Sequence, residues 1–177
     1  HSSINLAEMQ HSKYVYIEGY LVTSPIAKTM LNTLITKARE SKTKIALTLS
    51  DATLVTNYHE TFIYLMQENP IDLLFCNQHE ACSFAKTDNI DQAKEFLKQY
   101  SKQFVITLGA KGSCIYDGSK FHYIQGEKVN AINTLGAGDM YAGAYLYAIT
   151  KGFTPKDAGI FANKASSKIV TQSGPRL

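Results

Sequence analysis

The feature that most constrains the fold of this chain is an alternation between short apolar runs and segments with helical spacing. The runs are rich in β-branched and aromatic residues, which favours strands at residues 14–20, 44–49, 71–76 and 104–108. Between them, apolar residues recur three and four positions apart, as they do in helices. Strands that alternate with helices form parallel βαβ units. We therefore expect an α/β fold of three layers, with a mostly parallel sheet covered by helices on both faces.

Turn and capping residues predict where the other elements lie. A first helix should begin at Ser24-Pro25, because serine caps free amides and proline suits the first helical position. A β-hairpin is expected around Asp117-Gly118-Ser119, where it joins residues 112–117 to residues 120–125. Further helices are expected at about residues 56–68, just after residue 77, and at about residues 89–100, 138–151 and 155–171.

Composition limits the class of protein. The 177 residues are 45% hydrophobic and 19% charged, which is typical of one globular domain. No apolar run approaches the roughly 18 residues that a membrane-spanning helix needs, so we expect no membrane partner. The net charge is only +3 and the lysines are dispersed along the chain, which argues against a nucleic-acid partner.

Cysteine usage and the start of the chain suggest the compartment. Cys76, Cys82 and Cys114 form no CxxC pair, so we expect free thiols in a reducing cytoplasm. Cys76 and Cys82 with His79 lack the four closely paired ligands of a typical zinc site. The start, His1-Ser2-Ser3, has no basic region followed by an apolar stretch, so no secretory signal is expected. It also lacks an initiator methionine, which suggests that the sequence begins inside a longer protein.

The segment from Asn133 to Asp139, with the sequence Asn-Thr-Leu-Gly-Ala-Gly-Asp, carries most of the chemical information. Gly136 and Gly138 let the backbone turn sharply and bring amides close to a ligand. The helix that follows directs free amides and the positive end of its dipole at the same place, which favours an anion. Asp139 would repel a bound phosphate unless it takes a proton from a hydroxyl that attacks the phosphorus. The simpler alternative is that Asp139 only caps the helix.

Two common phosphate-binding motifs do not fit this segment. A P-loop has the pattern GxxxxGK[ST], and no lysine follows Gly138. A dinucleotide-binding fingerprint has the pattern GxGxxG, whereas the next glycine after Gly138 is Gly143, and the segment lies late in the chain. The segment therefore predicts neither of these two classes of nucleotide site.

Residues 134–139 and the helix of small residues after them resemble the second signature of the ribokinase, or PfkB, family of carbohydrate and nucleoside kinases. Four further segments resemble motifs of that family and occur in the expected order. They are Glu18-Gly19-Tyr20-Leu21 before Pro25, Asn77-Gln78-His79-Glu80, Thr107-Leu108-Gly109-Ala110-Lys111-Gly112, and Ala162-Asn163-Lys164-Ala165-Ser166. The motifs are similar to those of the adenosine kinase branch. The likeness covers the whole chain, residues 1–177, but only the carboxyl half of the family's length.

The resemblance implies a ribokinase-like fold and transfer of the γ-phosphate of ATP to a hydroxyl of a sugar or nucleoside. It makes Asp139 the catalytic base, with an anion hole formed by Gly136, Ala137 and Gly138. The residues implied to line the nucleotide phosphates, the ribose and the adenine are Thr107, Gly109, Gly112 and Asn163. The residues implied to help hold Mg²⁺, through water, are Asn77 and Glu80.

Each of these roles has a structural alternative. The glycines at positions 109 and 112 could simply make a turn, and Asn163 could belong to a close helix contact. Asn77 and Glu80 have the positions of a helix cap and its partner three residues later. Where the family usually has aspartate, this chain has Asn133, which argues against activation by a monovalent cation.

The resemblance also implies that part of the enzyme is missing from these residues. The family's glycine-rich first signature, its lid and most of its sugar-binding residues are not found here, so residues 1–177 form the nucleotide-binding carboxyl-terminal part of a longer kinase. We expect this part alone to be inactive and, through an exposed sheet edge, to associate with itself. Two other functions stay open: a nucleotide-binding module without catalysis, and a dinucleotide-binding oxidoreductase domain.

Overall fold

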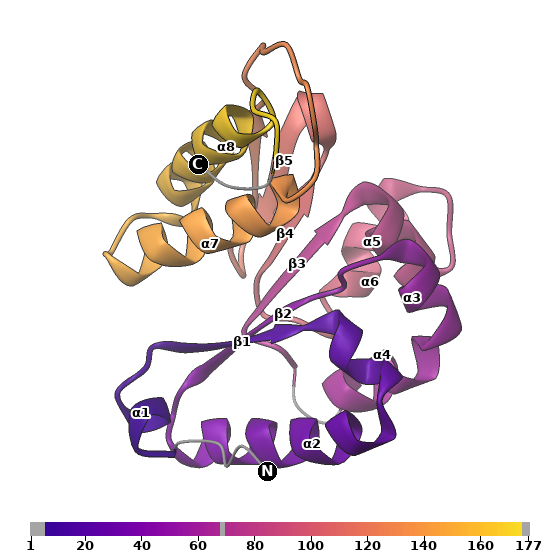
Figure 1. Cartoon of the computed structure of the whole chain (residues 1–177). Helices are drawn as coiled ribbons and strands as arrows, with labels where there is room; N and C mark the ends of the chain where they lie inside the picture. The colour runs from indigo at the N-terminus through magenta and orange to yellow at the C-terminus, as the bar shows by residue number, and fades with distance from the viewer. Residues whose placement is uncertain (1–5, 68–69, 175–177) are drawn as a thin grey trace. The chain divides into compact units, whose positions relative to one another are not determined.

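The computed structural model describes residues 6–67 and 70–174. Its six strands form a mixed sheet in the order β1-β2-β3-β4-β5-β6 (Figure 1). The strands are β1 (Tyr14–Glu18), β2 (Lys44–Thr48), β3 (Leu73–Asn77), β4 (Phe104–Thr107), β5 (Gly112–Tyr116) and β6 (Phe121–Gln125). The α-helices are α1 (Leu6–Gln10), α2 (Pro25–Glu40), α3 (Ala52–Asn57), α4 (His59–Gln67), α5 (Gln78–Ala85), α6 (Ile90–Leu97), α7 (Ala137–Thr150) and α8 (Pro155–Ile169). Two 3₁₀ turns, η1 (Gly19–Thr23) and η2 (Gly109–Lys111), complete the list.

The chain divides into two compact parts, the first with residues 1–75 and 79–104, the second with residues 76–78 and 105–177. In the first part, β1 pairs with β2 and β2 with β3, both in parallel, as the βαβ pattern predicts. Consecutive residues Ile45, Ala46 and Leu47 of β2 have no exposed surface. Because neighbouring residues of a strand point to opposite faces, both faces of the sheet are covered at β2.

The prediction of one helix at about residues 56–68 is wrong. Two helices, α3 and α4, occupy this region and meet at Tyr58, whose backbone is not helical. The helix begins earlier than predicted because the Asp51 carboxylate accepts a hydrogen bond of 2.9 Å from the Leu54 amide and so caps α3.

Two strand ends also differ from the prediction. Gly19 and Tyr20 belong to the 3₁₀ turn η1 and do not extend β1. A side chain at Gly19 would come within 2.6 Å of the Thr48 carbonyl oxygen, so the chain turns here close against the end of β2. β3 begins at Leu73, and Ile71 forms only an isolated bridge to Ser101.

The second part contains the predicted β-hairpin. β5 and β6 are antiparallel, with Gly112 opposite Gln125. The turn is held by the Asp117 carboxylate, which accepts hydrogen bonds from the amides of Ser119 and Lys120 at 2.8 and 2.9 Å. The hairpin therefore forms where turn residues predict it.

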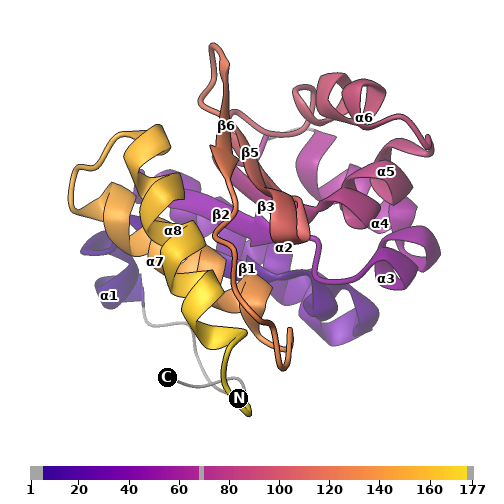
Figure 2. The same ribbon diagram turned by 90° about the horizontal axis from the view of Figure 1, so that it is seen from above.

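Helices α7 and α8 pack against each other on one side of this hairpin, and α8 contacts both of its strands (Figure 2). The contact is close because α8 presents small buried residues, Ala158, Gly159 and Ala162. A Cβ atom at Gly159 would lie 2.3 Å from the Ile115 side chain. The amino-terminal turn of α7 is thereby attached to a well-packed group of elements.

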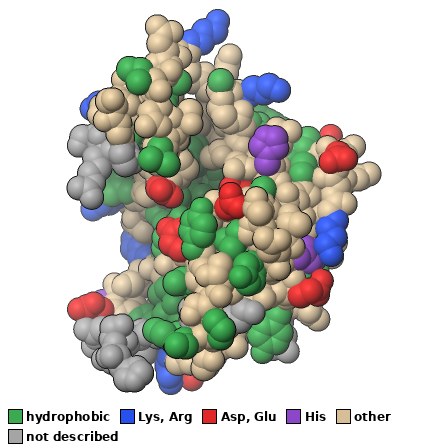
Figure 3. Space-filling view, turned by 45° about the vertical axis from the view of Figure 1, so that its right-hand side comes forward, with side chains coloured by type: hydrophobic (Ala, Val, Ile, Leu, Met, Phe, Trp, Pro, Cys, Tyr) green, Lys and Arg blue, Asp and Glu red, His purple; other side chains and the backbone are tan. Residues whose placement is uncertain are grey.

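None of the helices in the described ranges is long and apolar enough to cross a membrane. Lysine and arginine side chains are scattered over the face in Figure 3 and do not gather into one patch there.

Candidate functional site

A cavity of about 630 Å³ lies within the second part of the chain. It is bounded by the turn after β4, the segment of residues 126–131 after β6, the start of α7 and one side of α8. The site residues expected from the sequence that line it are Thr107, Gly109, Gly112, Ala137, Gly138 and Asn163. The fold therefore brings residues that are up to 56 positions apart to one cavity of ordinary small-molecule size.

The turn after β4 depends on glycine. Gly109 and Gly112 have positive φ angles of 59° and 100°, a region that other residues rarely adopt. A Cβ atom at Gly112 would lie 2.0 Å from the Ile124 carbonyl oxygen. Position 112 must therefore lack a side chain for the backbone of this turn to lie close to the hairpin and beside the cavity.

Gly112→Ala should lower the free energy of unfolding by about 2–4 kcal/mol, because it adds backbone strain and a clash with a carbonyl that cannot move aside. Urea unfolding monitored by circular dichroism measures the change. Gly143→Ala is the control, since Gly143 lies inside α7 with open space around it and alanine favours a helix. Equal stability of the two variants would contradict the steric requirement at Gly112.

The first turn of α7 presents backbone amides without partners. Its N-cap, Gly136, has a left-handed backbone with φ 77° and contributes no capping side chain. The Ala137 amide donates to the Thr134 carbonyl at 3.2 Å. Within the described residues, the amides of Gly136, Gly138 and Asp139 donate to no protein atom. These three donors at the positive end of a helix make the turn suited to an anion.

Asp139 lies in this turn, is exposed, and forms no hydrogen bond or ion pair with any described residue. The N-cap is Gly136, so Asp139 does not cap α7 and the simpler interpretation of this residue is wrong. An acidic residue in the first turn still interacts favourably with the helix dipole. Its carboxylate oxygens are therefore available to a ligand.

Asn133 has a structural task at the start of the same segment. Its side-chain oxygen accepts a hydrogen bond of 2.9 Å from the Leu135 amide. The backbone amides of Ile132 and Asn133 donate to the Val170 carbonyl at the end of α8, at 2.7 and 3.2 Å. These bonds hold the loop that leads into α7 against α8.

Asn163 lies on α8, lines the cavity and is only 6% exposed. Its amide nitrogen donates to the carbonyls of Gln125 and Ile124 at 3.1 and 3.4 Å, and its oxygen accepts from Ser113 at 3.3 Å. Its polar atoms are thus used to join α8 to the hairpin, a role beyond the nucleobase contact that the resemblance implies.

Tyr141 and Ser113 were not found from the sequence as site residues, and Ser166 was found only as part of the motif around Asn163. Tyr141 and Ser166 line the cavity, and the Ser166 hydroxyl donates to the Ala137 carbonyl at 3.0 Å. Ser113 and Tyr141 are linked by a hydrogen bond of 2.8 Å although they are 28 positions apart. The sequence signal that could have indicated this pair is a serine hydroxyl within the apolar strand β5 and a tyrosine hydroxyl within the apolar helix α7.

Asn77 and Glu80 do not line this cavity. Asn77 is the last residue of β3, and Glu80 lies in the first turn of α5 with 6% of its surface exposed. Their amide and carboxylate oxygens are the kind of ligand that Mg²⁺ prefers. The described residues contain no cluster of three or more His, Cys, Asp or Glu side chains that could hold a metal ion by themselves.

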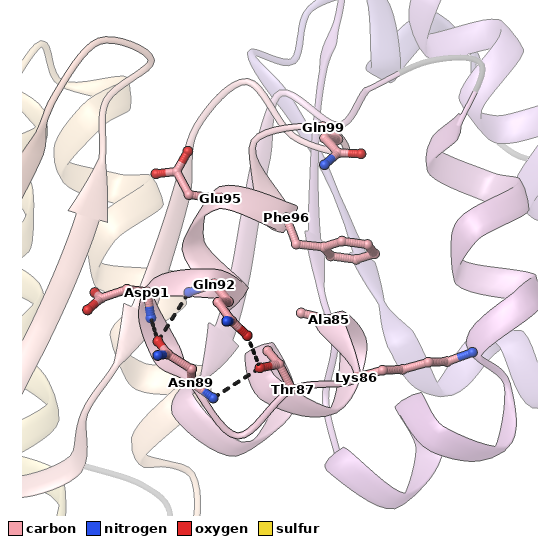
Figure 4. A pocket seen from close by; sticks show the side chains of 9 residues that line it. All are labelled: Ala85, Lys86, Thr87, Asn89, Asp91, Gln92, Glu95, Phe96 and Gln99. Carbon is pink, nitrogen blue, oxygen red and sulfur yellow. Dashed lines mark hydrogen bonds between the residues drawn. The ribbon is translucent and has the colours of Figure 1, made fainter.

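A second hollow lies in the first part of the chain, along α6 and the turn before it (Figure 4). Part of its lining is joined by hydrogen bonds. The Thr87 hydroxyl donates to Gln92 at 2.6 Å, and the Asn89 side chain caps α6 by accepting from the amides of Asp91 and Gln92. The polar side chains of Thr87, Asn89 and Gln92 thus serve the start of α6.

Comparison with known proteins decides the family. The sequence profile of the pfkB family of carbohydrate kinases matches residues 1–177. The chain belongs to the PfkB family. The motif resemblance is thereby confirmed, and so is the α/β ribokinase-like fold with a largely parallel sheet.

Individual relatives agree with this family. The chain is 37% identical over 111 residues to a ribokinase of Staphylococcus aureus (strain COL), a match that covers 59% of this chain and 36% of the relative. The adenosine kinase of Sinorhizobium meliloti superposes with a TM-score of 0.94 at 30% identity, over 98% of this chain and 54% of that one.

A more distant structure shares the fold. It is an aminoimidazole riboside kinase from Salmonella enterica in complex with aminoimidazole riboside and an ATP analogue. Its TM-score is 0.80 at 17% identity, over 92% of this chain and 58% of that one. This PfkB-family chain thus spans about half the length of the structures that it matches.

Proposed function

We propose that this chain is the nucleotide-binding part of a phosphotransferase that moves the γ-phosphate of ATP to a hydroxyl of a sugar or a nucleoside. The observation that carries the proposal is one turn that combines three unpaired amides with an unpartnered carboxylate and that lines the cavity through Ala137 and Gly138. An anion site next to a free base suits phosphoryl transfer, which needs positioned charge more than covalent chemistry. The names of the relatives, ribokinase and adenosine kinase, support the class of acceptor.

The proposed mechanism assigns Asp139 the role of general base. Its carboxylate would accept the proton of the acceptor hydroxyl as that oxygen attacks the γ-phosphorus. The bond from that phosphorus to the β,γ-bridging oxygen breaks, and ADP leaves. The Asp139 carboxylate is exposed and has no partner among the described residues, so it is accessible to the acceptor hydroxyl.

The backbone at the start of α7 would stabilise the charge on the transferred phosphoryl group. The amides of Gly136, Gly138 and Asp139 are the donors with no protein acceptor. The Ala137 amide would join them only by giving up its hydrogen bond to the Thr134 carbonyl. The turn would line the rest of the nucleotide with backbone at Gly109 and Gly112, because these two residues have no side chain to obstruct the approach.

Asn77 and Glu80 fit the donor chemistry of a Mg²⁺ site, and we propose that they hold this ion through water. When bound, Mg²⁺ supplies positive charge to the phosphate oxygens. Asn77 ends β3 and Glu80 lies in the first turn of α5, so the two oxygen-bearing side chains are only three positions apart in the chain.

Glu80→Gln should raise the Mg²⁺ concentration for half-maximal rate by about tenfold, because an outer ligand orients the waters of the ion. The measurement is a Mg²⁺ titration of the initial rate at fixed ATP. Glu60→Gln is the control, since Glu60 also lies in the first turn of a helix but its side chain is 87% exposed. An unchanged Mg²⁺ titration in Glu80→Gln would assign Glu80 to structure alone.

The proposed function is tested by release of ADP from Mg·ATP, with ribose, adenosine and cytidine as acceptors. The complete gene product should release ADP only when a suitable acceptor is present. Binding of ATP without acceptor-dependent turnover would instead favour a non-catalytic nucleotide-binding module. Binding of NAD in preference to ATP would favour an oxidoreductase domain, against which the family membership already argues.

A further inference from the structure

The position of Asp139 is set by its backbone, because its side chain contacts no described protein group that could orient it. The turn that carries it is attached to the rest of the second part at two points. One lies two residues before Asp139, where the Ala137 carbonyl accepts from the Ser166 hydroxyl at 3.0 Å. The other lies two residues after it, at the Tyr141 side chain, which is 2% exposed.

The second attachment is a chain of hydrogen bonds with one consistent direction. The Asn163 amide faces two carbonyl oxygens, those of Ile124 and Gln125, so its nitrogen must donate to them. Its oxygen then accepts the single hydroxyl proton of Ser113 at 3.3 Å. The hydroxyl of Tyr141 must therefore donate to the Ser113 oxygen at 2.8 Å.

This series of hydrogen bonds connects four elements around the cavity: α7, β5, α8 and β6. Ser113 is 1% exposed and does not line the cavity, so it is out of reach of a ligand there. Burial raises the pKa of the Tyr141 hydroxyl far above its usual range, which keeps the phenol protonated as the donor. Each hydroxyl and amide proton in this series of hydrogen bonds has an acceptor. A buried polar network is rigid when all its groups are satisfied in this way.

The tyrosine ring alone would meet the packing needs of this position. It stacks on Tyr145 of the same helix, with the ring centroids 6.2 Å apart. A phenylalanine would keep that contact and lose only the bond to Ser113. The Tyr141 hydroxyl therefore attaches α7 to β5, whereas the packing at this position comes from the ring.

We propose that Tyr141, acting through Ser113 and Asn163, is a positioning residue for Asp139. The inference rests on the proposed function, because it assigns a purpose to the accurate placement of that carboxylate. Ser166 holds the same turn from its other side. α8 thus determines the geometry of a base that none of its side chains touches.

The test is a double-mutant cycle in the complete gene product, with ATP and either ribose or adenosine as acceptor. Tyr141→Phe and Ser113→Ala should each lower kcat by about tenfold, since displacement of a reacting group by about 1 Å costs up to about 10²-fold. The dissociation constant of Mg·ADP, measured by calorimetry, should change by less than about threefold. In an Asp139→Asn background, both substitutions should lower kcat by less than about twofold, because there is no base left to misplace.

Tyr145→Phe is the control, since Tyr145 is equally buried on the same helix but does not line the cavity. It should leave kcat unchanged. An unchanged kcat in Tyr141→Phe, or an equal loss in the wild-type and Asp139→Asn backgrounds, would overturn the positioning role. Failure of the proposed function has a different signature, namely normal turnover in Asp139→Asn itself.

Discussion

Asp139→Asn should lower kcat by about 10²–10⁴-fold, the usual contribution of a general base. The substitution keeps the size of the side chain and the backbone amides of the turn, so nucleotide binding should stay within about threefold of the wild-type value. The exposed carboxylate has no described protein partner, so its loss should leave the stability of the fold nearly unchanged. A large kinetic effect with normal binding and stability would identify a chemical role. The measurements are initial rates with saturating Mg·ATP and acceptor, and calorimetric binding of Mg·ADP.

The matched control is Asp157→Asn. Asp157 lies in the first turn of α8, at the same helical position that Asp139 has in α7, and interacts with the Thr154 cap. It should lower stability slightly and leave kcat within about twofold, because its carboxylate already accepts from the Thr154 hydroxyl at 2.6 Å and does not belong to the turn with the unpaired amides. Near-normal kcat in Asp139→Asn would show that Asp139 is not the base and would remove the central element of the proposed mechanism.

Residues 1–177 alone should bind Mg·ADP but have no measurable sugar- or nucleoside-kinase activity. The residues that we assign to the nucleotide lie within one part of this chain and line one cavity. What we expect to be missing is an acceptor hydroxyl held in line with the γ-phosphate. Such orientation contributes about 7–11 kcal/mol of barrier lowering, so a base without a bound acceptor should achieve little.

The comparison uses acceptor-dependent ADP release by residues 1–177 and by the complete gene product at equal concentration. Gel filtration of the same samples reports whether the shorter chain associates with itself, as the edge strand β1, which pairs only with β2, would favour. Comparable specific activity in the two proteins would show that the acceptor site lies within these residues. The proposed division of the enzyme into two portions would then be wrong.

Local sequence patterns predicted most of the fold. Apolar runs gave the correct order of strands, and capping residues such as Ser24-Pro25 and Thr154-Pro155 gave helix starts to within a residue. These predictions succeed because caps and apolar periodicity act over a few residues of chain. The exceptions are the start of α3, which the Asp51 cap decides, and the turn at Gly19, where the chain lies close against the end of β2.

Six of the residues that the sequence predicts for the site line one cavity, but the hydrogen bonds that connect them were not predicted. Glycines with positive φ and a carboxylate after two glycines are recognisable in the sequence, because their chemistry depends on residue type and local turn geometry. The hydrogen bonds of Asn163 are not recognisable in the sequence, since its partners Ser113 and Gln125 are 50 and 38 positions away.

The sequence by itself therefore determined the order of elements, the glycine-containing turn before α7 and the family. Only the tertiary structure decided how that turn is held, through the chain from Tyr141 to Asn163 and the bond from Ser166 to Ala137. The physical reason is the distance along the sequence between the residues that interact. Secondary structure and turns follow from interactions between near neighbours, whereas a buried hydroxyl takes whichever partner the packing of distant elements brings within hydrogen-bonding distance.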